Sequence, residues 1–139
     1  MAQTVEFLFD TGLERYKAGE AAETLIPVFK EVCDRSPEIS SAWICLSWLY
    51  LLDNKPKLAA KAARRAVKLN PQDPQARINL AMSMLEIGEK GLRQHIDVAK
   101  QLIFVNEEWD KEIKDSIADG LSRKPDWQSL QKVKTWLSE

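Results

Sequence analysis

The chain has 139 residues, a length that suits a single domain with a sizeable hydrophobic core. Its 45% hydrophobic and 29% charged residues are typical of a globular protein and exclude a disordered or collagenous chain. The formal net charge of -1 argues against a surface built as a whole for nucleic acid or an anionic membrane. The start of the chain carries no basic segment followed by an apolar one, so we expect an intracellular, cytoplasmic protein.

Two helices are predicted in the first part of the chain, over residues 5–18 and about 21–34. The apolar side chains on one face of the first helix are Phe9, Leu13 and Tyr16. Pro27 falls in the first turns of the second segment, so we expect that helix either to start late or to bend. Pro37 follows as a stop signal.

The most apolar stretch is residues 42–52, which is too short to span a bilayer and therefore belongs to a core. A surface helix needs only one apolar stripe, so a segment that is apolar almost all round must be covered on two sides. One helical row consists of Trp43, Leu46, Ser47 and Tyr50, and a second row consists of Ile44, Trp48, Leu51 and Leu52. We expect the first row to pack inside the fold, whereas the partner of the second row indicates function.

Further helices are predicted over residues 56–69, from about residue 74, over about 94–105 and in two C-terminal segments. Pro56 suits the first position of its helix. Gly120 is expected to weaken the end of the first C-terminal helix, and Pro125 to begin the second.

A repeat of 34 residues underlies this pattern, because Pro37 and Pro71 are 34 positions apart and many apolar positions superpose under the same shift. In the central unit the recurring positions are Trp43, Leu46, Ser47, Tyr50, Ala59, Ala63, Ala66 and Pro71. This order resembles the signature of the tetratricopeptide repeat (TPR) family. The resemblance is clear in residues 40–73 and weaker in 6–39 and 74–106.

The resemblance implies an all-α, right-handed solenoid of helical hairpins that forms one domain over residues 1–139. Three repeats would cover about 6–39, 40–73 and 74–106, and two helices over 107–139 would cap the array. It also implies a scaffold for protein binding, such as an adaptor, a chaperone-like cochaperone or an assembly factor.

In the TPR family the first helix of each repeat lines a concave groove. The resemblance places Phe7, Asp10, Glu14, Lys17 and Gln75 on this face, together with the predicted partner-binding residues Ile44, Trp48, Leu51, Leu52, Ile78, Met82 and Leu85. We expect the partner to be another protein that offers a helical or extended peptide segment. Three alternatives for covering the apolar part remain open: a partner, a second copy of the chain in a homodimer, or the chain's own last helix with Trp127, Leu130 and Trp136.

Catalysis is not expected, because the sequence shows no nucleophile beside a base, no phosphate-binding loop and no metal cluster. The single histidine, His95, predicts a structural or solvated role. Cys33 and Cys45 lack a CxxC spacing and are expected to be reduced and buried. We therefore predict no cofactor, no metal and no small-molecule substrate.

A basic face is predicted on the helix over 56–69, within residues 55–68. Its cations are Lys57, Lys61, Arg64, Arg65 and Lys68. A solvated outer surface is the simpler interpretation. The alternative function is a charge-driven adaptor for an acidic partner, a membrane surface or nucleic acid, of which nucleic acid is the weakest because no aromatic residues interleave the cations.

Overall fold

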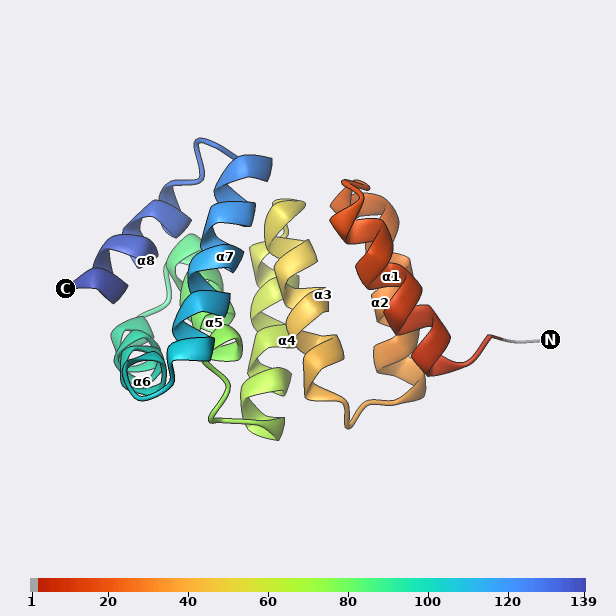
Figure 1. Cartoon of the computed structure of the whole chain (residues 1–139), viewed down its shortest axis with the longest axis horizontal. Helices are drawn as coiled ribbons and strands as arrows, with labels where there is room; N and C mark the ends of the chain where they lie inside the picture. The colour runs from red at the N-terminus through yellow and green to blue at the C-terminus, as the bar shows by residue number, and fades with distance from the viewer. Residues whose placement is uncertain (1–2) are drawn as a thin grey trace.

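The computed structural model describes residues 3–139 and contains eight α-helices within that range (Figure 1). They are α1 (Val5–Lys17), α2 (Ala22–Arg35), α3 (Ser40–Leu52), α4 (Pro56–Leu69), α5 (Pro74–Ile87), α6 (Leu92–Phe104), α7 (Glu107–Arg123) and α8 (Gln128–Ser138). Each helix from α1 to α6 packs against the next, so that hairpins stack along the long axis. The predicted all-α, TPR-like fold class is confirmed.

Several helices begin at a side-chain cap or at a proline. The side chains of Thr4, Asp73 and Asn106 accept hydrogen bonds from backbone N–H groups in the first turns of α1, α5 and α7. Helix α2 begins at Ala22, five residues before Pro27, so of the two expected alternatives, a late start or a bend, the late start is excluded. The helix accommodates the proline with the loss of one backbone hydrogen bond.

Two boundaries near the C-terminus differ from the sequence-based ones. Helix α6 begins at Leu92 because Gly88 and Gly91 both have positive φ and reverse the chain within a short turn. Helix α8 begins at Gln128 rather than at Pro125, since the backbone N–H of Trp127 bonds to the carbonyl of Lys124 in a turn.

Small side chains let α4 lie close to both neighbours. The buried residues of α4 are Ala59, Ala60, Ala62, Ala63 and Ala66. Because alanine adds little bulk beyond the backbone, α3 and α5 can both pack tightly against this helix. The first row of α3 is correspondingly enclosed, with Leu46, Ser47 and Tyr50 buried.

A buried polar cluster joins α3 to α5. The amide nitrogen of Asn79, which is fully buried, donates to the backbone oxygen of Ile44 at 3.1 Å and to Oγ of Ser47 at 2.9 Å. The side-chain oxygen of Asn79 accepts from Nε2 of Gln75 at 2.7 Å. The polar groups of this interface are therefore paired, which fixes how α5 sits against α3.

We expect Asn79→Ala to lower the free energy of unfolding by about 1–2 kcal/mol, because it removes two buried hydrogen bonds to α3 and leaves Oγ of Ser47 without this donor. Urea denaturation followed by circular dichroism measures the change. Gln75→Ala, which removes only the half-buried donor to Asn79, should cost less. An Asn79→Ala midpoint equal to that of the wild type would contradict this role.

Helix α7 lies over α5 and runs alongside α5 and α3 (Figure 1). It packs against α5, α6 and α8, and its C-terminal end reaches α1 through a hydrogen bond between Asp119 and Tyr16. Helix α8 packs on α5 and α6. Within residues 3–139, no helix combines the length and the apolar character needed to cross a membrane.

Candidate functional site

The C-terminal helices cover much of the predicted partner-binding face. Leu51, Ile78 and Met82 are buried, and Trp48 keeps only 8% of its surface exposed. The other predicted groove residues, Ile44, Leu52 and Leu85, are half-buried. Of the three alternatives for covering the apolar part, the chain's own tail accounts for this region.

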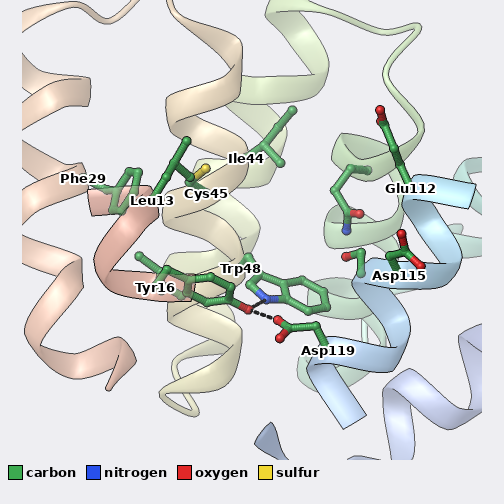
Figure 2. A pocket seen from close by; sticks show the side chains of 12 residues that line it. Leu13, Tyr16, Phe29, Ile44, Cys45, Trp48, Glu112, Asp115 and Asp119 are labelled. Carbon is green, nitrogen blue, oxygen red and sulfur yellow. Dashed lines mark hydrogen bonds between the residues drawn. The ribbon is translucent and has the colours of Figure 1, made fainter. Parts of the chain in front are cut away.

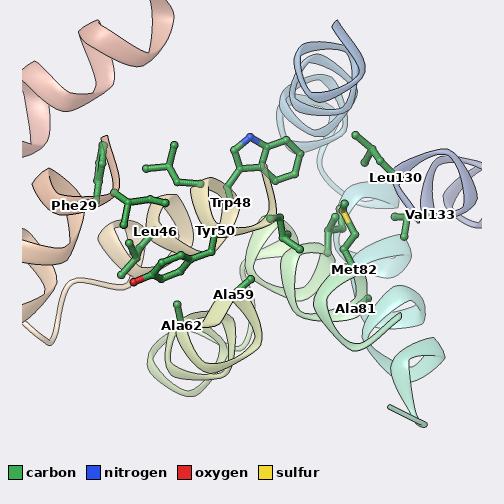
Figure 3. Packing of buried hydrophobic residues seen from close by; sticks show 14 of the residues in the cluster. Phe29, Leu46, Trp48, Tyr50, Ala59, Ala62, Ala81, Met82, Leu130 and Val133 are labelled. Carbon is green, nitrogen blue, oxygen red and sulfur yellow. The ribbon is translucent and has the colours of Figure 1, made fainter. Parts of the chain in front are cut away.

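Three side chains of the C-terminal segment form this cover. The ring of Trp127 lies against that of Trp48, with centroids 5.2 Å apart. Leu130 and Val133 are fully buried; Val133 lies beside Met82 (Figure 3), and Cδ2 of Leu130 lies against Gly120 of α7. The last helix thus replaces water over the middle of the face, where a partner segment would otherwise dock.

Gly120 allows α7 to lie directly on Trp48. A Cβ atom at this position would lie 2.7 Å from Cδ2 of Leu130 and 2.8 Å from Cζ2 of Trp48. Helix α7 continues past Gly120 to Arg123. The missing side chain serves packing against α3 and α8.

A polar joint ties α7 to α1 and α3. The indole N–H of Trp48 donates to Oη of Tyr16 at 2.9 Å, and Tyr16 donates in turn to a carboxylate oxygen of Asp119 (Figure 2). Arg123 contacts Asp119 with Nε at 3.0 Å and donates from Nη2 to the backbone oxygen of Tyr16 at 2.7 Å. Burial and the bond to Asp119 raise the pKa of Tyr16, so its hydroxyl remains a donor at neutral pH.

Two further polar contacts hold the tail. Nζ of Lys124 donates to Oδ1 of Asn54 at 2.6 Å and to the backbone oxygen of Leu51 at 3.2 Å. Close to this lysine, the indole N–H of Trp127 donates to Oε2 of Glu86 at 2.8 Å. The start of the tail is therefore fixed in orientation by directional bonds to the ends of α3 and α5.

An open pocket of about 340 Å³ remains beside this cover, between α1, α3 and α7 (Figure 2). It exists because α3 packs against α5 but diverges from α1. The wall contributed by the first hairpin and α3 is mainly apolar and includes Leu13, Tyr16, Phe29, Ile44, Cys45, Trp48 and Leu49. The opposite wall on α7 consists of Glu112, Asp115, Ser116 and Asp119, and Gln75 lies at its edge. We call this the α1–α7 pocket.

The α1–α7 pocket contains only part of the predicted groove. It includes Ile44, Trp48 and Gln75, whereas Leu52 and Leu85 lie outside it. Sequence reasoning placed Leu13 and Tyr16 on an apolar packing face, considered Glu112 only as part of an acidic segment that could neutralise the basic face of a neighbouring molecule, and assigned no role to Asp115 and Asp119. The spacing of Asp115 and Asp119 on one helical face was the available signal, but nothing in it indicated contact with α1.

The two thiols occupy different environments. Cys33 is buried, as predicted, whereas Cys45 is half-buried and lines the α1–α7 pocket. Burial raises the pKa of each thiol to about 12, so neither forms a thiolate at neutral pH. Both are poor nucleophiles in this structure.

His95 and the basic face lie away from the pocket. Nδ1 of His95 is 3.0 Å from Nη1 of Arg77, and burial together with this cation lowers the pKa of the histidine. The five predicted cations of α4 are all exposed. Arg64 pairs with Glu89, which adds an acidic neighbour to the face.

Several solved structures share this fold at low sequence identity. The type III secretion chaperone SycD of Yersinia enterocolitica, in complex with a peptide of the translocator YopD, aligns with 97% of this chain and 95% of its own, with a TM-score of 0.71 and 19% identity. PcrH, in complex with the chaperone binding region of PopD, aligns with 94% of this chain and 92% of its own, with a TM-score of 0.69 and 14% identity. The first TPR of Spaghetti (RPAP3), bound to an HSP90 peptide, aligns with 100% of this chain and 97% of its own, with a TM-score of 0.57 and 17% identity.

Sequence comparison agrees with the structural likeness over the centre of the chain. The pattern of the tetratricopeptide repeat family matches residues 40–83, which span α3, α4 and most of α5. No curated protein matches the sequence. The match to the tetratricopeptide repeat family thus covers residues 40–83, and the described part of the chain shares the TPR-like helical-hairpin fold of these solved structures.

Proposed function

We propose that this protein is a non-catalytic interaction module, acting as an adaptor, cochaperone or assembly factor, that binds an apolar or amphipathic segment of another protein. The observation that carries the proposal is the α1–α7 pocket, whose apolar wall is open to solvent between α1 and α3. The peptide complexes of SycD and PcrH support it, since both proteins have this fold. Free thiols suit the reducing cytoplasm, where we place the protein.

The predicted groove residues divide into two sets under this proposal. Ile44 and the edge of Trp48 are accessible through the α1–α7 pocket. Leu51, Ile78 and Met82 lie beneath the tail, and Leu52 and Leu85 are half-buried outside the pocket. We infer that a partner engages the open set first and reaches the covered set only where α8 is displaced.

Peptide selection tests the proposal without a known partner. Peptides selected from a random displayed library should be rich in bulky apolar residues and should bind about tenfold more weakly to Ile44→Gln, the effect of losing about 1.4 kcal/mol of contact. Leu58→Gln is the matched control, because Leu58 is 47% exposed on α4 and away from the pocket. Fluorescence anisotropy measures the affinities.

Two results of the selection would contradict the proposed site. Peptides that bind Ile44→Gln and wild type equally, with unchanged circular dichroism of the variant, would show that the pocket is not the binding site. A loss of binding in Leu58→Gln alone would move the site to the outer surface of the solenoid.

The basic face supports a second candidate, a charge-driven adaptor for an acidic partner or a membrane surface. The observation that favours it is that all five cations of α4 are exposed, with an ion pair to only one of them, Arg64, within residues 3–139. Binding through this face should collapse at high salt, whereas apolar binding in the pocket should survive. Nucleic acid is the weakest partner, since the cations have no aromatic residues among them for base stacking.

A further inference from the structure

The two walls of the α1–α7 pocket differ in chemistry. The α1–α3 side offers Leu13, Ile44 and the ring of Trp48, while the α7 side offers carboxylates (Figure 2). No lysine or arginine lines the pocket. The surface inside the pocket is almost entirely apolar, so a ligand must place an apolar group within it and can meet the exposed carboxylates of Glu112 and Asp115 only at its edge.

The size of the pocket restricts the ligand. Its volume of about 340 Å³ lies at the low end of the range for ligand sites, roughly 300–1,000 Å³. A whole helix, with a diameter of about 10–12 Å, requires far more room. The pocket suits one or two side chains projecting from a segment that passes along the surface.

Two of the three carboxylates are available to a ligand. Asp119 is already bound to Tyr16 and Arg123. Glu112 and Asp115 are exposed and take part in no ion pair within residues 3–139. They stand three positions apart on α7, so their carboxylates lie on neighbouring parts of one helical face.

The surrounding charges reinforce this asymmetry. Lys114, which adjoins Asp115 in the chain, is held by Asp110 at 2.8 Å and does not line the pocket. Asp10 of α1 is exposed one helical turn before Leu13 and forms no ion pair within residues 3–139, but it does not line the pocket. Lys111, four positions before Asp115 on α7, is exposed and forms no ion pair within the same range. The α7 edge of the pocket therefore carries two carboxylates without ion pairs beside one lysine, an excess of negative charge.

We propose that the α1–α7 pocket selects a protein segment that presents a bulky apolar side chain flanked by lysine or arginine, with the apolar group against Leu13, Ile44 and Trp48 and the cation beside Glu112 and Asp115. Lysine and arginine suit both walls, because their apolar stems can follow the hydrophobic surface while the charged ends reach the carboxylates. This inference rests on the proposed function and adds the charge class of the partner to it.

A peptide series tests the charge preference. Three peptides share one apolar centre, taken from the selected library, and carry lysine, glutamine or glutamate on both sides of it. At low salt the lysine peptide should bind about three- to tenfold more tightly than the glutamine peptide, as expected for two exposed charge contacts, and the glutamate peptide should bind most weakly. The lysine advantage should shrink as salt increases.

Matched protein variants locate the cation. Glu112→Gln combined with Asp115→Asn should abolish most of the lysine advantage. Glu107→Gln combined with Glu108→Gln removes the same charge from exposed positions in the first turn of α7 and should preserve it. The indole N–H resonance of Trp48, assigned with Trp48→Phe, should shift when any binding peptide occupies the pocket.

The outcomes separate this inference from the proposed function. Equal binding of the lysine and glutamate peptides, with a shift of the Trp48 resonance, would overturn the charge preference and leave the interaction module standing. A lysine advantage that survives in the Glu112 and Asp115 variant would place the cation elsewhere and also overturn it. Failure of every peptide to move the Trp48 resonance would refute the proposed function itself.

Discussion

Replacing Trp48 with alanine is expected to lower the free energy of unfolding by about 3–5 kcal/mol, the usual cost of removing a large aromatic side chain from a core. The side chain is 8% exposed and contacts Trp127. Its indole N–H also donates to Tyr16, so the variant loses a hydrogen bond of the polar joint. Urea denaturation, followed by far-ultraviolet circular dichroism, measures the change.

Trp48→Phe separates the ring from its N–H group. It keeps most of the apolar contact but cannot donate to Tyr16, so its cost should be smaller, about 1–2 kcal/mol. A Trp48→Ala protein with the denaturation midpoint of the wild type would show that the tail does not rest on this side chain. The expected instability also makes Trp48→Ala unsuitable as a test of partner binding, for which Ile44→Gln is the better probe.

Gly120→Val is expected to destabilise the chain by about 3 kcal/mol, at the upper end of overpacking costs. Even the first carbon of a side chain would lie within 3 Å of Leu130 and Trp48. Relief requires α7 or α8 to move away, because the Trp48 ring is rigid. Limited proteolysis should therefore cut the variant between residues 120 and 139 faster than the wild type.

Ala118→Val is the control for the helix propensity of valine, since Ala118 is exposed on the same helix two residues earlier. It should cost less than about 1 kcal/mol. Gly120→Ala should fall between the two, although alanine is the better helix former, because its methyl group still meets Leu130 and Trp48. A Gly120→Ala protein more stable than the wild type would mean that α7 does not press on α3.

The central helices were predictable because their signals are local and periodic. Trp43, Leu46 and Tyr50 repeat the spacing of neighbouring units, and Pro56 and Pro71 mark the ends of α4. That the last helix covers Trp48 was predictable only as one of three alternatives, beside a partner protein and a second copy of the chain. Helical spacing shows that Trp127 and Leu130 need burial, but it does not say which surface provides it.

The α1–α7 pocket could not be predicted from the sequence. Its acidic wall depends on α7 meeting α1, and the joining residues Tyr16 and Asp119 are 103 positions apart. A hydrogen bond between polar side chains leaves no periodic trace along the chain. The close packing at Gly120 was likewise not predictable, since a helix-weakening glycine and a close-packing glycine look the same in one sequence.

The contact between Tyr16 and Asp119 also bears on how the chain unfolds. In an open array of repeats each unit meets only its neighbours, so the ends can fray independently and stability is a sum along a line. Here α1 is hydrogen-bonded to α7, so the N-terminal and C-terminal parts of the array contact each other directly. Losing α1 would remove support from α7, and losing α7 would remove it from α1. We therefore expect the chain to unfold as a single cooperative unit, in which fraying at either end is resisted by the other.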